Sequence, residues 1–331
     1  MASTTWNLER IRREGNYWRS RVLITAAHLD LFSWIGKGEK SFGDIASHFG
    51  GDPAGWEIFL NSLCGMGLIR KRGKRYANSR FSLSYLSCGR AAFLLPAHDD
   101  WNIWGKLPRL LTTGKRPKVQ EPFFTDRKRT ERLLGALHLD GQKIAPYLVR
   151  RSALRRCATL LDVGGGYGTY AMAFCRRFPR LRATLLEHPR TVPLARRAVR
   201  DAGMAGKVRV IGKDLLRDPL PGGFDAVFLS NIIHGQGIDE NRSLITKLYR
   251  CLNPKGQLIL RDVFMNRDRT DPEWGTLFSV LLFLQTPKGR CYALDEIRRW
   301  LHEAGFSRVR GPFRSSPLPF DPDSVLIAEK R

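Results

Sequence analysis

The sequence predicts a doubly wound α/β domain that is preceded by a mainly helical domain with the pattern of a winged helix. Three observations predict this order. Helical patterns before residue 70 lead into a short hairpin pattern. From residue 159 onward, short apolar strands alternate with amphipathic helices. A glycine-rich stretch, 164–168, joins the first of these strands to its helix.

Length and composition indicate an ordinary globular protein. The chain has 331 residues, of which 43% are hydrophobic, enough for two domains with separate cores. The N-terminus lacks the continuous apolar segment of a secretory signal, and the longest apolar run, 277–284, is too short for a membrane span. The six cysteines have no metal-ligand spacing. We therefore expect a cytoplasmic protein with reduced thiols, no membrane span and no metal site.

The chain is strongly basic, with 56 Lys and Arg against 31 Asp and Glu and a formal net charge of +25. The excess is spread over both halves, with short clusters at 70–75, 127–132 and 150–156. Such a surplus suits nucleic acid, a membrane surface or an anionic small substrate. Because Lys and Arg also cover apolar surface readily, we first interpret each cluster as a solvated helix or loop face.

The first half predicts three helices and a hairpin. Apolar residues recur at helical spacing from Tyr17 to Phe49, with a break at 36–38, and again at 54–69. Gly73 then offers a turn between two short strands. Residues 81–150 are predicted to be mostly helical connecting material, with breaks at Pro96, Gly105, Pro108, 114–117 and Pro122.

The second half predicts the parallel sheet. Strand patterns alternate with helix patterns over the ranges 159–165, 169–178, 182–188, 191–203, 207–214, 224–233, 241–256 and 257–264. Two further segments, 307–313 and 324–331, are expected to form a closing strand pair. This alternation is typical of a sheet with helices on both faces, which binds ligands at the carboxyl ends of its strands.

The loop after the first of these strands has the spacing Gly164-x-Gly166-x-Gly168. At such a turn, backbone N–H groups and the helix dipole can meet a polar or charged ligand, and glycine permits close approach. A dinucleotide-binding fingerprint would place its last glycine where Thr169 stands, so the spacing argues against NAD. A purely structural tight turn remains the alternative.

Two acids follow the next two strands. Glu187 comes 21 residues after Gly166, where a carboxylate can accept hydrogen bonds from both ribose hydroxyls of an adenosine. Asp214 follows the third strand, where it can accept from an adenine amine beside the apolar Leu215. Each could instead be a helix N-cap or a surface acid. Since these strand ends share one edge, we expect an adenosine site there.

The motifs at 160–171, 185–196, 208–216, 225–235 and 252–262, in this order, resemble S-adenosylmethionine-dependent small-molecule O-methyltransferases of the caffeate, acetylserotonin and hydroxyneurosporene type. Segments 17–35 and 41–79 resemble that family's winged-helix dimerisation domain. The resemblance implies a homodimer, S-adenosylmethionine as cofactor and a Rossmann-like class I methyltransferase domain. It implies three parts: a dimerisation domain over 1–100, a helical connector contributing to the substrate pocket over 101–155, and a cofactor-binding domain over 156–331.

The resemblance also implies residue roles. Gly164 and Gly166 would pass beneath the methionine part of the cofactor, and Glu187 would hold the ribose. Asp214 and Leu215 would border the adenine. Ser230, at the end of the fourth strand, would lie near the cofactor. The residues in these roles are Gly164, Gly166, Glu187, Asp214, Leu215 and Ser230.

His234 matches the family's general base and follows the apolar strand at 224–233. A neutral imidazole can take the proton of a phenol as the new bond forms. Asp262, where the family often has a glutamate, would orient its second nitrogen. The alternatives are a histidine that caps the strand and an Asp262 that caps or pairs with Arg261. Because 235–237 depart from the plant-type pattern, substrate positioning without proton abstraction also stays open.

The segment 274–306 would, by resemblance, supply a helix over the acceptor and a closing helix. Phe278 and Leu282 lie at helical spacing and would line an apolar acceptor pocket, the alternative being core or dimer contact. The predicted acceptor is a small aromatic or isoprenoid-type metabolite.

Two other functions stay open. The same fold could methylate nitrogen or carbon, or bind the cofactor without transferring a methyl group. A nucleic-acid-binding winged-helix protein or an RNA methyltransferase is disfavoured, because the third helical pattern, at 52–69, is apolar and carries almost no side chains that could contact bases. We therefore expect no nucleic-acid partner.

Overall fold

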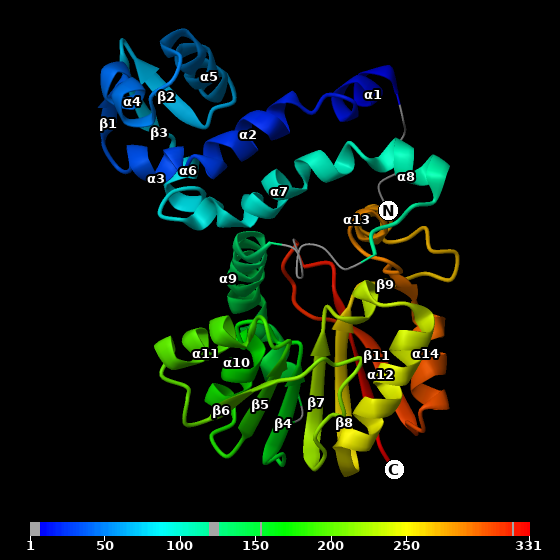
Figure 1. The fold of residues 1–331 in the computed structure, drawn as a ribbon. Helices are drawn as coiled ribbons and strands as arrows, with labels where there is room; N and C mark the ends of the chain where they lie inside the picture. Colours follow the sequence, from blue (N-terminus) through cyan, green and yellow to red (C-terminus); the bar gives the residue numbers. More distant parts are fainter. Residues whose placement is uncertain (1–6, 119–125, 153, 320) are drawn as a thin grey trace. The chain divides into compact units, whose positions relative to one another are not determined.

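A computed structural model describes residues 7–118, 126–152, 154–319 and 321–331 (Figure 1). The chain divides into two compact units, of which the first ends at Trp101 and the second runs from Asn102 to Arg331. Each unit has its own hydrophobic core. None of the described helices is long and apolar enough to cross a membrane.

The first unit contains the predicted helices and hairpin. Its elements up to the hairpin are α1 (Leu8–Glu14), α2 (Trp18–His28), α3 (Leu31–Ile35), β1 (Glu39–Ser41), α4 (Phe42–Phe49), α5 (Pro53–Gly65), β2 (Ile69–Arg72) and β3 (Arg75–Asn78). The strands form an antiparallel sheet in the order β1-β3-β2, and Gly73 turns the hairpin with φ 56°. Ser41 and Asp44 form a capping box at the start of α4, and Asp52 caps α5 ahead of Pro53.

Helices continue through the connecting region, as predicted. They are α6 (Arg80–Tyr85), η1 (Arg90–Leu94), α7 (Leu95–Trp104), α8 (Leu107–Thr113) and α9 (Arg127–Arg151). Pro96 and Pro108, predicted as breaks, lie in the first turns of α7 and α8, where a missing N–H costs nothing. Gly114 ends α8 in the left-handed conformation. The predicted break at Pro122 lies outside the described residues.

The second unit is built on a seven-stranded sheet in the order β11-β12-β8-β7-β4-β5-β6. Its strands are β4 (Thr159–Val163), β5 (Arg182–Glu187), β6 (Val208–Gly212), β7 (Phe224–Ser230), β8 (Leu252–Asp262), β11 (Arg308–Arg314) and β12 (Ser324–Glu329). The five neighbouring strands β8, β7, β4, β5 and β6 are parallel. At one edge, β12 pairs antiparallel with β8, and β11 pairs antiparallel with β12. The predicted doubly wound sheet and its closing strand pair are therefore confirmed.

Helices cover both faces of this sheet (Figure 1). The remaining elements are α10 (Thr169–Arg177), α11 (Val192–Asp201), η2 (Ile233–Gly235), α12 (Ile238–Cys251), β9 (Phe264–Met265), α13 (Glu273–Gln285), β10 (Tyr292–Ala293) and α14 (Leu294–Glu303). One face packs on α9, α10 and α11, and the other packs on α12 and α14.

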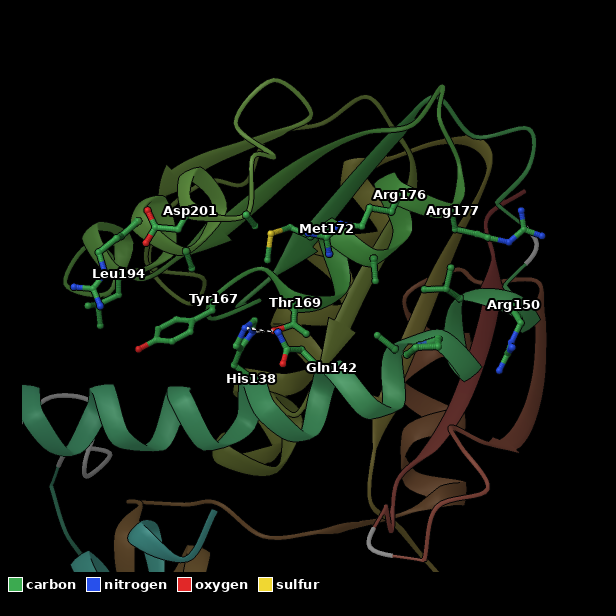
Figure 2. A pocket seen from close by; sticks show the side chains of 17 residues that line it. His138, Gln142, Arg150, Tyr167, Thr169, Met172, Arg176, Arg177, Leu194 and Asp201 are labelled. Atoms are coloured by element: carbon green, nitrogen blue, oxygen red, sulfur yellow. Dashed lines mark hydrogen bonds between the residues drawn. The ribbon is translucent and has the colours of Figure 1, made fainter. Parts of the chain in front are cut away.

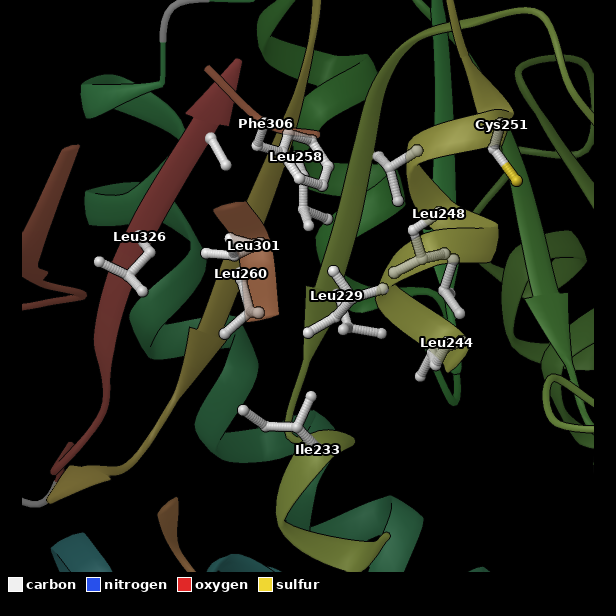
Figure 3. Close-up of a cluster of buried hydrophobic side chains, with 14 of the residues drawn as sticks. Leu229, Ile233, Leu244, Leu248, Cys251, Leu258, Leu260, Leu301, Phe306 and Leu326 are labelled. Atoms are coloured by element: carbon white, nitrogen blue, oxygen red, sulfur yellow. The ribbon is translucent and has the colours of Figure 1, made fainter. Parts of the chain in front are cut away.

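Alternation along the strands decides which side chain meets which helix layer. In β8, Leu258 and Leu260 join the cluster with α12 and α14, whereas Ile259 joins the cluster with α9, α10 and α11. Figure 3 shows Ile233 at one end of the first cluster, next to the end of β7. The strand order reverses between β4 and β7, which is the switch point where such sheets bind ligands.

Candidate functional site

The glycine loop leaves β4 at the switch point and enters α10. Gly164, Gly166 and Gly168 all have positive φ, at 65°, 56° and 75°, a conformation that L side chains rarely adopt. A Cβ atom on Gly164 would also overlap the Ile232 side chain. The loop is therefore fixed by its own backbone and by close packing, and it presents main-chain groups to the rim of the sheet.

Glu187 ends β5 and is only 9% exposed. Its Oε2 accepts a hydrogen bond from Gly166 N at 2.7 Å, and its Oε1 accepts from His188 N at 2.8 Å and from Thr191 Oγ1 at 2.9 Å. The acid that was predicted to hold a ribose thus also joins the loop after β4 to the end of β5. Among the described residues Oε2 has one donor, which leaves a second lone pair for a hydroxyl.

Asp214 lies beyond β6, at the neighbouring strand end. Its Oδ1 accepts hydrogen bonds from Leu216 N at 2.9 Å and Arg217 N at 3.2 Å, so the residue closes a local turn. Its Oδ2 makes no hydrogen bond to the described residues and lies 3.8 Å from Arg217 Nε. Leu215 is half-buried and packs on the core beside α12. Asp214 therefore combines a turn-closing oxygen with one that faces outward.

Ser230 ends β7 against a buried ion network that the sequence did not predict. Its Oγ accepts a hydrogen bond from Arg261 Nη1 at 3.2 Å. Arg261 is buried, and its guanidinium pairs with Asp321 Oδ1 at 2.6 Å and Asp323 Oδ2 at 2.7 Å. The Tyr170 ring lies 5.5 Å from its Cζ. The Arg261 guanidinium thus fixes the hydroxyl of Ser230, the residue that was predicted to contact the cofactor.

The network joins segments that are far apart in the sequence. Asp321 and Asp323 precede β12, which runs antiparallel to β8 with Ser324 opposite Asp262. Burial raises the pKa of Asp323 to about 6, in opposition to the charge of Arg261. The suggested pairing of Asp262 with Arg261 is wrong, because neighbouring residues of a strand point to opposite faces.

His234 and Asp262 meet on the face of the sheet opposite to Arg261. His234 Nδ1 lies 2.8 Å from Asp262 Oδ1, and Asp262 is only 1% exposed. Since a carboxylate only accepts, this bond assigns the proton to Nδ1 and leaves the lone pair on Nε2. Nε2 has no hydrogen-bond partner among the described residues, and the His234 side chain is 14% exposed. The imidazole is thus oriented on one side and open on the other.

Two opposing effects set the protonation of His234. Burial lowers its pKa, but the charge of Asp262 and its hydrogen bond raise it, and the charge of Asp323 adds to the rise. The net result is a pKa above the ordinary histidine value. The backbone of His234 is held as well, because its carbonyl accepts from Arg290 N at 2.9 Å.

The two α13 residues that were predicted to line a pocket differ in position. The Phe278 ring packs edge-on against the His234 imidazole, with centroids 4.9 Å apart. Leu282 is buried with Val263, Met265 and Cys291 in a small core beneath the helix. Phe278 therefore contacts the His234 imidazole, and Leu282 lies in the small core that supports the helix.

A fully buried acid under the glycine loop also went unpredicted. Asp162 in β4 accepts a hydrogen bond on Oδ2 from Ala171 N at 3.2 Å, in the first turn of α10. Its Oδ1 has no partner among the described residues. Burial raises the pKa of Asp162 to about 7, partly opposed by the Ala171 N–H and assisted by the charge of Glu187. An acid within a strand pattern directly before the glycines was the available signal.

Comparisons with known proteins match both parts of the chain to family models. Residues 121–307 match the family model of an O-methyltransferase domain, and residues 14–87 match that of an O-methyltransferase dimerisation domain. The chain is 28% identical over 324 residues to the tetracenomycin polyketide synthesis 8-O-methyl transferase TcmO of Streptomyces glaucescens, which covers 95% of this chain and 94% of that protein.

Two further similarities follow. The 3-hydroxy-5-methyl-1-naphthoate 3-O-methyltransferase of Streptomyces sahachiroi is 28% identical over 309 residues, covering 91% of this chain and 89% of that protein. The crystal structure of human N-acetylserotonin methyltransferase in complex with SAM has a TM-score of 0.84 at 20% identity, covering 100% of this chain and 99% of that one. The fold of the whole chain is therefore that of these enzymes.

Replacing Asp162 by asparagine tests the buried acid. Because its folded pKa exceeds the unfolded value, its contribution to stability is complete below about pH 4 and is lost as pH rises to about 7. The loss is on the order of 4 kcal/mol at most. Asp162→Asn cannot ionise, so urea unfolding should show it gaining stability relative to wild type between pH 5 and pH 8.

Asp225→Asn is the matched control. Asp225 accepts hydrogen bonds from Ala158 N and Thr159 N, and its pKa is lowered, so its titration is complete below pH 5. The difference in unfolding free energy between Asp225→Asn and wild type should therefore be the same at pH 5 and at pH 8. A difference for Asp162→Asn that is equally constant would contradict the assigned titration.

Proposed function

The chain belongs to the O-methyltransferase family with a dimerisation domain, and from this premise we propose that it methylates a hydroxyl of a small aromatic or isoprenoid-type metabolite with His234 as general base. Its methyl donor is S-adenosylmethionine, the cofactor of this family. The observation that carries the proposal is the imidazole of His234, whose Nδ1 is fixed by Asp262, whose Nε2 has no hydrogen-bond partner among the described residues, and whose ring packs against Phe278.

The residues at the switch point fit this cofactor. Glu187 Oε2 keeps a lone pair for a ribose hydroxyl, and Asp214 Oδ2 has no hydrogen bond to the described residues. The positive-φ turns of Gly164 and Gly166 leave a backbone surface without side chains. We propose that these four residues hold the cofactor with Leu215 and Ser230. When bound, S-adenosylmethionine supplies an electrophilic methyl group on a sulfonium.

The chain's own groups then act on the acceptor. The hydroxyl proton passes to His234 Nε2 as the acceptor oxygen forms its bond to the methyl carbon and the carbon–sulfur bond breaks. Asp262 keeps the proton of the imidazole on Nδ1 and stabilises the imidazolium that forms. Alignment of the reacting atoms supplies much of the rate, so the fixed His234 backbone contributes too.

Aromatic side chains support a flat acceptor. Phe278 packs against His234, and the half-exposed Trp274 packs on Phe278 with ring centroids 4.7 Å apart. Such rings favour stacking with an aromatic acceptor. The names of the two similar Streptomyces enzymes, a polyketide and a hydroxynaphthoate O-methyltransferase, point in the same direction. We propose that Phe278 lines the acceptor pocket, with Leu282 behind it.

We also propose the division into a dimerisation domain over 1–100, a connector over 101–155 and a cofactor-binding domain over 156–331. The match at 14–87 to a dimerisation domain supports the first part and a homodimer. The connector's Arg116 donates from Nε to Thr286 O at 3.2 Å and from Nη2 to Gly289 O at 3.0 Å. These contacts support its contribution to the substrate side, because Gly289 directly precedes the residue that holds the His234 carbonyl.

Removing the imidazole tests the proposed base. His234→Ala should keep cofactor affinity within about 2-fold, but its kcat on a hydroxyl acceptor should fall roughly 100-fold or more. The assay uses labelled S-adenosylmethionine with a panel of hydroxynaphthoates and the matching aminonaphthoates. His302→Ala, which removes a histidine of α14, is the control and should retain activity. Full turnover of hydroxyl acceptors by His234→Ala would contradict the role of His234 as general base. Methyl transfer to the aminonaphthoates alone would favour N-methylation.

The pH profile tests Asp262 separately. His234 must be neutral to accept a proton, so kcat should rise as pH passes through the elevated pKa of the histidine. Asp262→Asn removes the charge that raises this pKa while burial still lowers it, so the inflection should move to lower pH. The plateau should also fall, because an amide does not fix the tautomer as a carboxylate does. An unchanged inflection would mean that Asp262 only fills space.

Cofactor binding tests Glu187. Glu187→Gln keeps the size of the side chain but removes charge-assisted hydrogen bonds, so the Kd for S-adenosylhomocysteine should rise about 10- to 100-fold by calorimetry. Thr191→Val is the control, because it removes one structural hydrogen bond to the carboxylate and leaves the carboxylate in place. Its Kd should change by less than about 3-fold. Equal affinity of Glu187→Gln and wild type would rule out the ribose contact.

A further inference from the structure

A second cavity lies in the helical layer formed by α9, α10 and α11, outside the proposed catalytic site (Figure 2). Its volume is about 780 Å³, which is within the range of pockets that bind small molecules. None of Glu187, Asp214, His234 and Asp262 lines it. The proposed methyl transfer therefore gives this cavity no role.

Part of the lining is apolar. Ala145 and Val149 come from α9, Met172 and Ala173 from α10, and Ala198 from α11. Four of these five side chains end within one or two carbons of the backbone, so the three helices leave a hollow between them. An apolar surface of this kind is stabilised when a ligand removes it from water.

Arginines from all three helices line the same cavity. Arg150 lies on α9, Arg176 and Arg177 on α10, and Arg197 on α11, whereas Asp201 is the one acidic lining residue. Among the described residues, neither Arg176 nor Arg197 has an ion-pair partner. Figure 2 shows Arg150 and Arg177 toward one end, Arg176 nearer the middle beside Met172, and Asp201 toward the other end. Among the described residues, the arginines that line the pocket therefore give it a positive charge that the one lining acid, Asp201, offsets only in part.

The middle of the pocket is polar and neutral. His138 Nδ1 lies 2.6 Å from Thr169 Oγ1, and Gln142 Nε2 lies 3.0 Å from His138 Nε2. Burial lowers the pKa of His138, so the ring adds no charge at neutral pH. Tyr167 and Thr169 flank Gly168 of the glycine loop, so the cavity adjoins the proposed cofactor site from the helical side.

We propose that this pocket is a second ligand site, which binds a small molecule with a flat or aliphatic body and one carboxylate, sulfonate or phosphate group. The anionic group would contact Arg150, Arg176 and Arg177, where bidentate hydrogen bonds to guanidinium are strong. The body would cover Val149 and Met172. The concave shape and the apolar lining favour such a molecule over an extended polyanion, which needs an open basic stripe.

The probe is 8-anilinonaphthalene-1-sulfonate, whose fluorescence rises in apolar pockets. Full-length protein is titrated with saturating S-adenosylhomocysteine, so that the cofactor site is filled. The double variant Arg150→Ala/Arg176→Ala should bind the probe about 10- to 100-fold more weakly than wild type. Arg180→Ala/Arg196→Ala removes two exposed charges outside the cavity and should bind it within about 2-fold.

Two further arms identify the place of binding. N-phenyl-1-naphthylamine has the same rings without the sulfonate, and its affinity should be unchanged in Arg150→Ala/Arg176→Ala. Ala198→Phe fills the hollow and should weaken both dyes at least about 10-fold. Unchanged S-adenosylhomocysteine affinity and circular dichroism establish that each variant is folded.

Equal probe affinity in the two double variants would overturn the proposal, and so would unchanged binding of both dyes to Ala198→Phe. Neither result would affect the proposed methyl transfer, because the cavity shares no proposed catalytic residue.

Discussion

The hydrogen bond from Gly166 N to Glu187 Oε2 joins the two structures on which the site depends. It ties the turn after β4 to the end of β5, directly beside the point where the strand order reverses. The positive φ of Gly166 aims its N–H at this carboxylate, and Thr191 holds the other oxygen from the start of α11. One carboxylate therefore fixes the position of the loop and is also the proposed ribose ligand, so a loop that slipped away from β5 would lose both contacts.

The gathering of the site residues at one edge of the sheet was predictable, because the local sequence pattern shows where each strand ends. Gly166, Glu187, His234 and Asp262 each follow an apolar strand, and the carboxyl ends of parallel strands share one edge. The sequence therefore predicted that these residues would gather, and the structure brings His234 and Asp262 within 2.8 Å. Their chemical roles remain predictions, since proximity alone does not transfer a proton.

What the sequence could not predict depends on contacts between distant segments or on side-chain direction. Arg261 meets Asp323 only because β12 folds back antiparallel on β8, and no local pattern encodes that return. Ser230 was placed at a strand end, but that position does not say that a guanidinium would hold it. Phe278 and Leu282 are four residues apart on one helix face, so their spacing does not distinguish them. Only the structure shows that Phe278 packs on the His234 imidazole and that Leu282 lies in the core.

Net charge proved a poor guide to the charge of the site. The chain carries +25, but acids gather at the rim of the sheet. Asp321 and Asp323 pair with the buried Arg261, and Asp262 lies on the opposite face beside His234. Ionised buried carboxylates favour nearby cations, which suits the proposed sulfonium and the imidazolium proposed to form on His234. The arginines of the proposed second site lie instead on the outer helices α9, α10 and α11, where they line the second cavity. An anion bound in this cavity would therefore lie outside the proposed catalytic site.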